Sequence, residues 1–98
     1  MRQITKDAYS AFKLRERFKS SNTEVRISGD AVYLLLYDNK IAKRTKNGLF
    51  LSHAGWPTNT TRERLSPFVD EIRKCKEDII IGEKVKLTNN WTHYDHRR

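Results

Sequence analysis

The sequence is poor in cysteine, proline and glycine, with one, two and four of these residues among 98. It also has no apolar run near the roughly 20 residues that cross a bilayer, and MRQITKDAYS has no apolar core of a secretory signal. A single thiol, Cys75, excludes an internal disulfide and suits a reducing compartment, where an inert packing role is typical. We therefore expect a soluble protein of the cytoplasm, without membrane contact.

Catalytic and metal-binding motifs are missing as well. The sequence has no GxSxG, Walker loop, paired CxxC or HExxH. His93 and His96 could join His53 or Cys75 at a metal, but a structural zinc site needs four ligands at recognisable spacing. We predict a non-enzymatic protein that holds no metal and no cofactor, and keep a small metal-dependent nuclease as a minor alternative.

Negative charge is scarce. Lys and Arg number 20 against 12 Asp and Glu, and the net charge of +8 creates a field that attracts polyanions. The excess is concentrated, because residues 1–23 and residues 38–64 each carry a net +4 while residues 70–86 are neutral. Nucleic acid is therefore the leading partner, with the first helix and the 40–64 segment as its basic face.

The pattern of apolar residues predicts an α+β fold. We expect an N-terminal helix, an antiparallel β-meander of about four strands, a helix kinked or broken at Pro67, and a C-terminal β-hairpin. The chain is long enough for one domain, over residues 1–92, followed by a flexible tail over residues 93–98.

The segment boundaries follow from periodicity and turn residues. The predicted helices cover residues 4–19, a stretch from about Thr61, and Phe68–Lys76; the predicted strands cover residues 24–28, 31–37, 40–45, 49–53, 79–81 and 84–87. Turns are expected at Gly29-Asp30, Asp38-Asn39 and 46–48. The predicted core is Ile4, Phe12, Phe18, Val25, Ile27, Val32, Leu34, Leu36, Ile41, Leu49, Leu51, Leu65, Val69, Ile72, Ile79 and Ile81.

The segment GLFLSHAGWPTNTTRERL holds the densest cluster of candidate contacts. Thr60 and Glu63 have capping-box spacing, so a helix beginning near Thr61 would point free amides at a phosphate, with Arg62 and Arg64 beside it. Trp56 either stacks on an exposed base or packs its loop onto the core. The candidate nucleic-acid contacts are Lys13, Arg17, Lys40, Lys43, Arg44, Lys46, Trp56, Asn59, Thr60, Arg62 and Arg64.

Three stretches carry a family resemblance: Asn22-Thr23-Glu24-Val25, Ile41-Ala42-Lys43-Arg44 and the twelve residues AGWPTNTTRERL from Ala54 to Leu65. With these, residues 4–65 resemble a family of small, mostly uncharacterised proteins of tailed bacteriophages. The resemblance implies a phage origin and expression in the cytoplasm of a bacterial host, and implies no biochemical activity. After Leu65 the chain departs from the family pattern.

The leading hypothesis is a phage accessory protein that binds nucleic acid, with DNA favoured over RNA. The alternative is a protein that captures and inhibits a host factor, such as a defence or nucleic-acid-processing enzyme. Tyr33, Tyr37, Trp56 and the arginines are residue types that dominate such protein interfaces. The sequence leaves the oligomeric state open.

Overall fold

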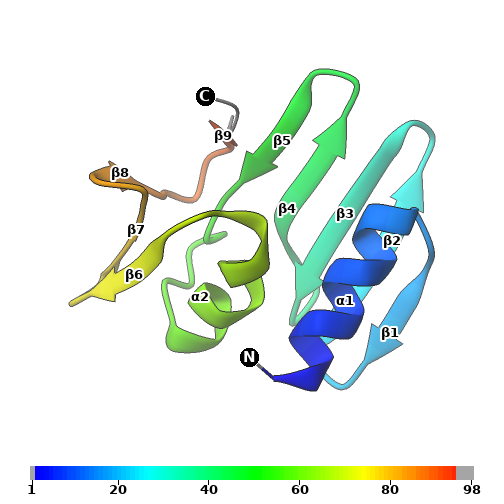
Figure 1. The fold of residues 1–98 in the computed structure, drawn as a ribbon, viewed down its shortest axis with the longest axis horizontal. Helices are drawn as coiled ribbons and strands as arrows, with labels where there is room; N and C mark the ends of the chain where they lie inside the picture. The colour runs from blue at the N-terminus through cyan, green and yellow to red at the C-terminus, as the bar shows by residue number, and fades with distance from the viewer. Residues whose placement is uncertain (1, 95–98) are drawn as a thin grey trace.

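The chain begins with a helix and continues as antiparallel strands. In the computed structural model, which describes residues 2–94, α1 (Gln3–Leu14) precedes strands that each pair with the next. They are β1 (Phe18–Ser20), β2 (Thr23–Ser28), β3 (Ala31–Leu36), β4 (Asn39–Thr45) and β5 (Gly48–Leu51). A later strand, β9 (Thr92–Tyr94), returns to pair with β5, so the six-stranded sheet has the order β1-β2-β3-β4-β5-β9 (Figure 1).

The antiparallel meander was predicted from the sequence, and tight turns set its register. Ser28 pairs with Ala31 across the Gly29-Asp30 turn, where Gly29 takes the left-handed φ of 59°. The next turn lies one residue earlier than expected, at Tyr37-Asp38, whose φ values are 51° and 66°. The shift occurs because the following residue, Asn39, already pairs with Leu36.

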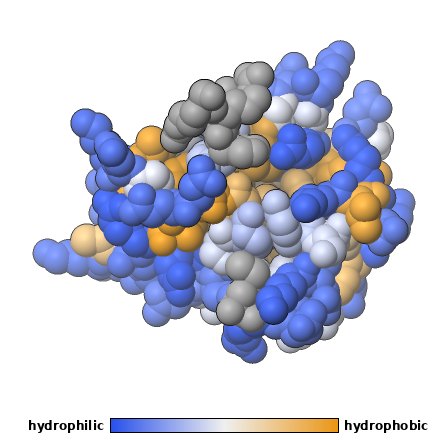
Figure 2. Space-filling model, viewed as in Figure 1, coloured by the Kyte–Doolittle hydropathy of each residue, from blue (hydrophilic) through white to orange (hydrophobic). Residues whose placement is uncertain are grey.

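The helical segments lie on one face of this sheet (Figure 1). α1 contacts β1, β2 and β3, while α2 (Asn59–Leu65) contacts β4 and continues into a short 3-10 helix, η1 (Ser66–Phe68). A second sheet of β6 (Ile72–Cys75), β7 (Asp78–Ile81) and β8 (Val85–Lys86) joins the same core. Figure 2 shows this helix-bearing side, on which hydrophilic side chains surround smaller apolar areas.

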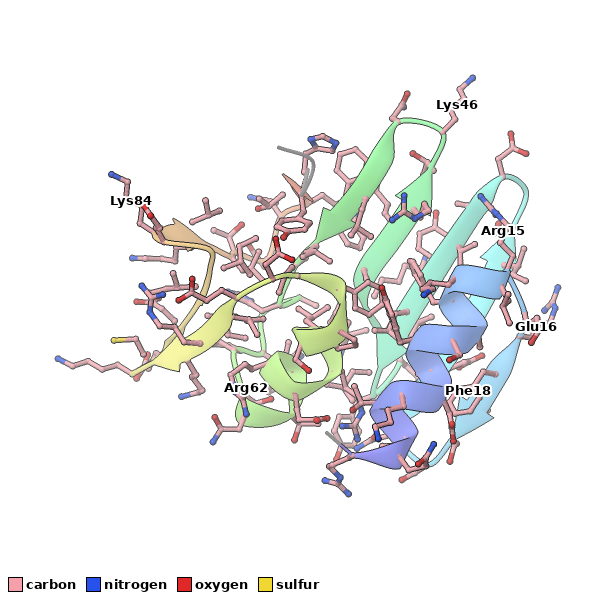
Figure 3. The ribbon with its side chains drawn as sticks, in the orientation of Figure 1. Arg15, Glu16, Phe18, Lys46, Arg62 and Lys84 are labelled. Atoms are coloured by element: carbon pink, nitrogen blue, oxygen red, sulfur yellow. The ribbon has the colours of Figure 1, made fainter. Side chains whose placement is uncertain are left out.

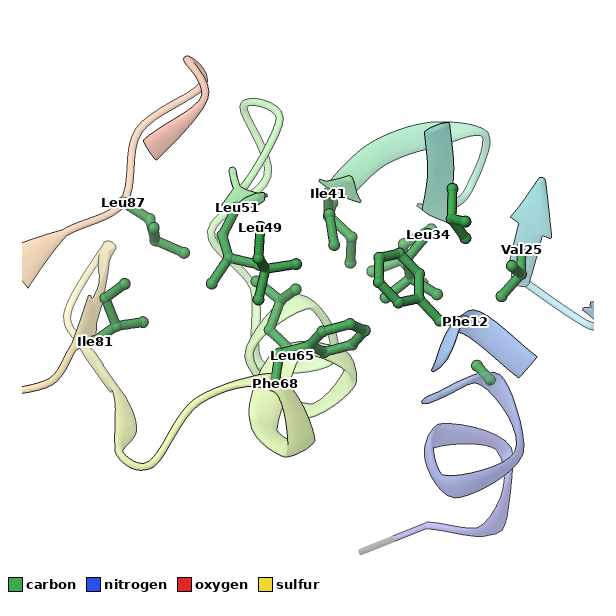
Figure 4. Close-up of a cluster of buried hydrophobic side chains, with 14 of the residues drawn as sticks. Phe12, Val25, Leu34, Ile41, Leu49, Leu51, Leu65, Phe68, Ile81 and Leu87 are labelled. Carbon is green, nitrogen blue, oxygen red and sulfur yellow. The ribbon is translucent and has the colours of Figure 1, made fainter. Parts of the chain in front are cut away.

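One continuous core lies between the helices and the two sheets (Figure 4). Phe68 meets Tyr9 and Phe12 edge-on, with ring centroids 4.9 Å apart in each pair. The buried apolar residues of this core are Ala8, Ala11, Phe12, Val25, Val32, Leu34, Leu36, Ile41, Ala42, Leu49, Leu51, Leu65, Phe68, Ile79, Ile81 and Leu87. Five predicted core residues are only half-buried because they lie at the margins of the core: Ile4, Phe18, Ile27, Val69 and Ile72.

The first helix is shorter than the predicted 4–19. It ends at Leu14, and Arg15 caps it in the left-handed conformation with φ 57° (Figure 3). Phe18 then pairs with Val25 as the first residue of β1. Its helical spacing misled the prediction, because Phe18 reaches the margin of the core equally well from an edge strand.

The predicted helix over Phe68–Lys76 is wrong, and the broken-helix alternative at Pro67 holds. α2 stops at Leu65, Pro67 lies in η1, and Ile72 pairs with Ile81 in a β-hairpin. Exposure alternates along β6 as in a strand, half-buried then exposed. The apolar spacing from Phe68 to Cys75 fits a helix, but residues 72–75 form a strand because pairing with the isoleucines of β7 satisfies the backbone hydrogen bonds of both segments.

The first two residues of the predicted tail lie in a strand of the sheet. His93 and Tyr94 belong to β9 and lie opposite Phe50 and Leu49 of β5. Residues 95–98, which include His96 of the metal hypothesis, lie outside the described residues. This strand pairs across a long separation in sequence, which local patterns do not reveal.

A buried arginine ties three elements together. Arg64 of α2 is 3% exposed, and its Nε donates to Thr23 Oγ1 of β2 at 2.8 Å. Its Nη1 donates to Thr5 Oγ1 of α1 at 3.1 Å and to Glu63 Oε1 at 2.9 Å. Because Thr5 and Thr23 are themselves buried, each depends on this network for its hydrogen bonds.

The same network holds Glu63 in its ionised form. Partial burial by itself raises the pKa of Glu63, but hydrogen bonds from the Thr5 hydroxyl and the Arg2 amide, with the charge of Arg64, outweigh burial. The pKa of Glu63 therefore lies below its ordinary value. The Glu63 carboxylate thus accepts its hydrogen bonds from Arg2 and Thr5 at the start of α1, and it does not form the expected capping box with Thr60.

Replacing Arg64 by Ala should lower the free energy of unfolding by about 3 kcal/mol, because it removes the positive charge paired with Glu63 and the donor to two buried hydroxyls. Urea unfolding followed by circular dichroism measures the change. The neighbouring Arg62, which projects outward from α2 (Figure 3), provides the control, and Arg62→Ala should stay within about 0.5 kcal/mol of the native protein. Equal stability of the two variants would contradict this account of Arg64.

Glu63 should make stability depend on acid pH. Folding lowers the pKa of Glu63, so the unfolded chain binds this proton more readily than the folded chain. The contribution of Glu63 to the free energy of unfolding is therefore full above the ordinary pKa of about 4.3 and is lost as the pH falls below it. The stability difference between the native protein and Glu63→Gln should therefore shrink below that pH. Urea midpoints across a pH series measure it, with Glu77→Gln in the exposed β6–β7 turn as control. A pH-independent difference would overturn the assignment.

Candidate nucleic-acid interface

A row of side chains crosses the sheet on the face opposite the helices, here called the open face. Directly opposite residues of paired strands share a face, and Arg26 lies opposite Tyr33, Tyr33 opposite Lys43, Lys43 opposite Phe50, and Phe50 opposite His93. Core residues flank the row along the strands, so strand alternation turns the row away from the core; they are Val25, Val32, Leu34, Ala42, Leu49 and Leu51. We call these five residues the cross-strand row.

A β-bulge in β4 places two lysines on this face. Leu34 pairs with Ala42 and Leu35 pairs with Lys40, which leaves Ile41 as the extra residue. In an unbroken strand, Lys40 and Lys43 would point to opposite faces, since they are three residues apart. The bulge restores them to one face, while Ile41 and Ala42 are both buried.

The lysines lie over aromatic rings. Lys40 Nζ is 4.4 Å from the centroid of the Tyr33 ring, and Lys43 Nζ is 5.1 Å from Phe50 and 4.9 Å from Trp91. These distances are within the range of cation–π attraction. Charged amines and aromatic rings are therefore interleaved across the middle of the open face.

Carboxylates engage the cations at only one end of this face. Glu24 accepts a hydrogen bond from Arg26 Nε at 2.9 Å and lies 3.7 Å from Lys19 Nζ. The hydrogen bond from Arg26 is the main cause that lowers the pKa of Glu24 below its ordinary value. Among residues 2–94, the ion pairs of the structure involve neither Lys40 nor Lys43.

The predicted site residues do not form one surface. Lys40 and Lys43 lie on the open face, but Arg44 is opposite core residue Val32 and lines a hollow on the helix side together with Lys13. The expected single face made by the first helix and the 40–64 segment is therefore wrong, because strand alternation separates its cations. Lys46 projects from the tip of the β4–β5 hairpin (Figure 3), and Arg17 is exposed between α1 and β1.

The start of α2 also differs from the predicted anion site. The helix begins at Asn59 because Thr58 caps it, with the Thr61 amide donating to Thr58 Oγ1 at 3.2 Å. Thr61 is buried and its hydroxyl donates to the Trp56 carbonyl at 2.7 Å. Thr60 is half-buried and follows exposed Asn59 in the first turn.

The two arginines of α2 therefore lie in different environments. Arg64 is enclosed in the network with Thr5 and Thr23, so its prediction as a phosphate contact is wrong, whereas Arg62 projects into solvent. Trp56 is 61% exposed, so the core-packing alternative for its side chain is also wrong. The segment AGWPTNTTRERL serves mainly to build the loop and the buried network.

Several residues of the interface were not predicted as contacts. Arg26 and Tyr33 are equally distant from the Gly29-Asp30 turn, so hairpin pairing would have placed them side by side. Phe50 follows from Lys43 in the same way across the next turn. Trp91 and His93 join only through the distant pairing of β9, for which the sequence carries no local signal.

Within the described chain, His, Cys, Asp and Glu side chains nowhere gather into a group that could hold a metal ion. No helix within residues 2–94 has the length and apolarity needed to cross a bilayer. The open face presents cations and aromatic ring faces, which are the groups that contact phosphate oxygens and stack on bases in proteins that bind nucleic acid.

One protein-family model matches the chain. Its description is Kyanoviridae Gp96 protein, and the match covers residues 1–95. The description names a group of phages and a gene product, and it states no activity. No curated protein and no solved structure matches the chain significantly.

Proposed function

This chain belongs to the Kyanoviridae Gp96 family of phage proteins, and we propose that it binds single-stranded nucleic acid through the open face of its six-stranded sheet. The observation that carries the proposal is the cross-strand row, in which Arg26, Lys43 and His93 alternate with Tyr33 and Phe50. The proposed role is binding without catalysis, in the cytoplasm of the infected host.

The row supplies both kinds of contact that a nucleic-acid strand needs. Lys40 and Lys43 offer charge to phosphates without competing carboxylates among the described residues. The rings of Tyr33, Phe50 and Trp91 offer surfaces on which bases stack, a contact worth about 1–3 kcal/mol per base. The net charge of +8 adds long-range attraction.

A single strand suits this surface better than a duplex. Stacking on a side chain requires a base whose face is free, whereas a duplex buries its base faces against neighbouring pairs. The row also crosses neighbouring strands, spaced about 4.8 Å apart, so an extended nucleic-acid strand laid across the sheet would meet its side chains in turn. DNA is the favoured form, and direct competition with RNA of the same sequence distinguishes the two.

A host protein with an acidic surface is the alternative partner. Arg26, Tyr33 and Trp91 are residue types enriched at binding hot spots, so the same face suits a protein interface. Capture of a host protein that survives nuclease treatment would favour this alternative, whereas loss of every partner after nuclease would favour nucleic acid.

Lys43→Gln should weaken binding to a short single-stranded DNA and reduce the slope of log affinity against log salt by about 0.7, the contribution of one phosphate contact on a single strand. Fluorescence anisotropy of a labelled oligonucleotide across a salt series measures both quantities. Duplex DNA of the same sequence should bind more weakly than the single strand at every salt concentration.

The matched control for Lys43→Gln is Lys13→Gln on α1. Lys13 Nζ also lies over an aromatic ring, 4.9 Å from the Tyr9 centroid, but on the helix side. Its replacement removes the same charge and the same kind of contact, and should leave the affinity unchanged beyond a small effect of net charge. A flat salt response, or equal losses in the two variants, would refute binding by the open face.

Glu24→Gln should strengthen binding, because it removes a negative charge from the open face and the carboxylate that Lys19 and Arg26 share, which leaves Arg26 with only the more distant Asp38 carboxylate at 3.7 Å. The affinity should rise about 2- to 5-fold at low salt, with a steeper salt slope, in the same anisotropy assay. Glu16→Gln makes the same charge change just beyond α1 and should have a smaller effect. Equal gains in both variants would indicate attraction by net charge alone.

A further inference from the structure

A hollow of about 290 Å³ lies on the helix side, where α1, the β4–β5 hairpin and η1 meet. We call it the helix-side hollow. Phe12, Leu49 and Phe68, which lie close together and are almost fully buried, contribute apolar lining (Figure 4). Sites for small organic ligands typically measure about 300–1,000 Å³, so this hollow lies at their lower limit. Its size therefore suits one apolar side chain better than a whole organic ligand.

Two cations line the hollow without an ionic partner. Lys13 of α1 and Arg44 of β4 are both exposed, and neither belongs to an ion pair within residues 2–94. Asp70 is the single carboxylate among the described lining residues, so two cations against one carboxylate leave a net charge of +1. An apolar hollow bordered by free cations is complementary to a ligand that carries carboxylates beside an apolar group.

The aromatic rings of the hollow are poorly placed to stack on a base. Phe68 meets both Tyr9 and Phe12 edge-on, and Phe12 and Phe68 are buried. Lys13 Nζ lies over the Tyr9 ring, 4.9 Å from its centroid. Stacking on a base requires an accessible ring face, which the cross-strand row offers and this hollow does not. Nucleic acid is therefore the weaker candidate for the helix side.

We infer that the helix-side hollow binds a short acidic segment of another protein. One large apolar side chain of the segment enters the hollow, and carboxylates on either side of it pair with Lys13 and Arg44. Because the hollow and the cross-strand row lie on opposite faces of the sheet, a bound segment leaves the open face accessible. The inference goes beyond the proposed function and does not depend on it.

A labelled peptide tests the inference. The probe is Gly-Asp-Glu-Phe-Asp-Glu-Gly, amidated and carrying an amino-terminal fluorescein, and its affinity is measured by fluorescence anisotropy at about 150 mM salt, where charges interact over about 8 Å. Replacing its Phe by Ser should weaken binding about 10- to 100-fold, because burial of one large apolar side chain is lost. Replacing its acids by Asn and Gln should weaken binding at least about 10-fold.

Variants of the protein locate the site. Arg44→Glu should weaken peptide binding about 10-fold, because it places a repulsive charge at the hollow. Lys46→Glu is the matched control, since it makes the same charge change at the tip of the β4–β5 hairpin (Figure 3) and should cost about 2-fold or less. Asp70→Asn should strengthen binding about 2- to 5-fold, because it removes a carboxylate that repels the peptide. All three side chains are exposed, and circular dichroism should show native spectra.

A titration with both ligands separates this inference from the proposed function. Peptide affinity should stay within about 2-fold when short single-stranded DNA saturates the protein, and Lys43→Gln should likewise leave it within about 2-fold. Peptide binding with the predicted dependence on Phe and Arg44 would support the hollow even if the oligonucleotide failed to bind, a result that would refute the proposed function alone.

Four results would overturn the inference while leaving nucleic-acid binding intact. They are failure of the peptide to bind, binding that does not depend on its Phe, equal losses from Arg44→Glu and Lys46→Glu, and displacement of the peptide by single-stranded DNA. The last result would assign the helix side to nucleic acid instead.

Discussion

The buried guanidinium of Arg64 is the interaction on which the arrangement of this protein depends. α1, β2 and α2 are far apart in sequence, and each contributes a polar group, from Thr5, Thr23 or Glu63, to this one side chain. Burial of such groups is costly unless every one is paired, so the network is satisfied only when the three elements lie in their native positions. A purely apolar core would tolerate a slide of the helices over the sheet much better than this network does.

With the helices fixed on one side, the surface on the other side of the sheet is set by register. The row from Arg26 to Phe50 exists because each hairpin pairs residues at fixed distances from its turn, and His93 joins it through the pairing of β9 with β5. The bulge at Ile41 shifts the alternation of side chains along β4 by one residue, so that Lys40 and Lys43 both lie on the open face. Backbone geometry, more than the number of positive charges, thus decides where the cations of this protein act together.

The sequence predicted the α+β class, the order of the first helix and strands, and most of the core, because these depend on local periodicity and on turns such as Gly29-Asp30. It failed where contacts with another element overrode what the local spacing or charge indicated. Residues 72–75 have a spacing that fits a helix as well as a strand, and only the partner strand β7 decides between them. Arg64 was indistinguishable from the half-buried Arg62, because charge in a sequence does not show which side chain is buried. The phage resemblance is confirmed, since the family model covers residues 1–95.

The late strand β9 gives the binding face an order of assembly. β1 to β5 join through tight turns, whereas β9 reaches β5 only after the whole of segment 52–91 has folded back, and long loops close more slowly. A short edge strand held by one neighbour is also the first to detach in local fluctuations. Trp91 and His93 would leave with it, so detachment of β9 would shorten the open face. A ligand that contacts these residues would favour the paired form of β9, because it would bind that form better than the detached one.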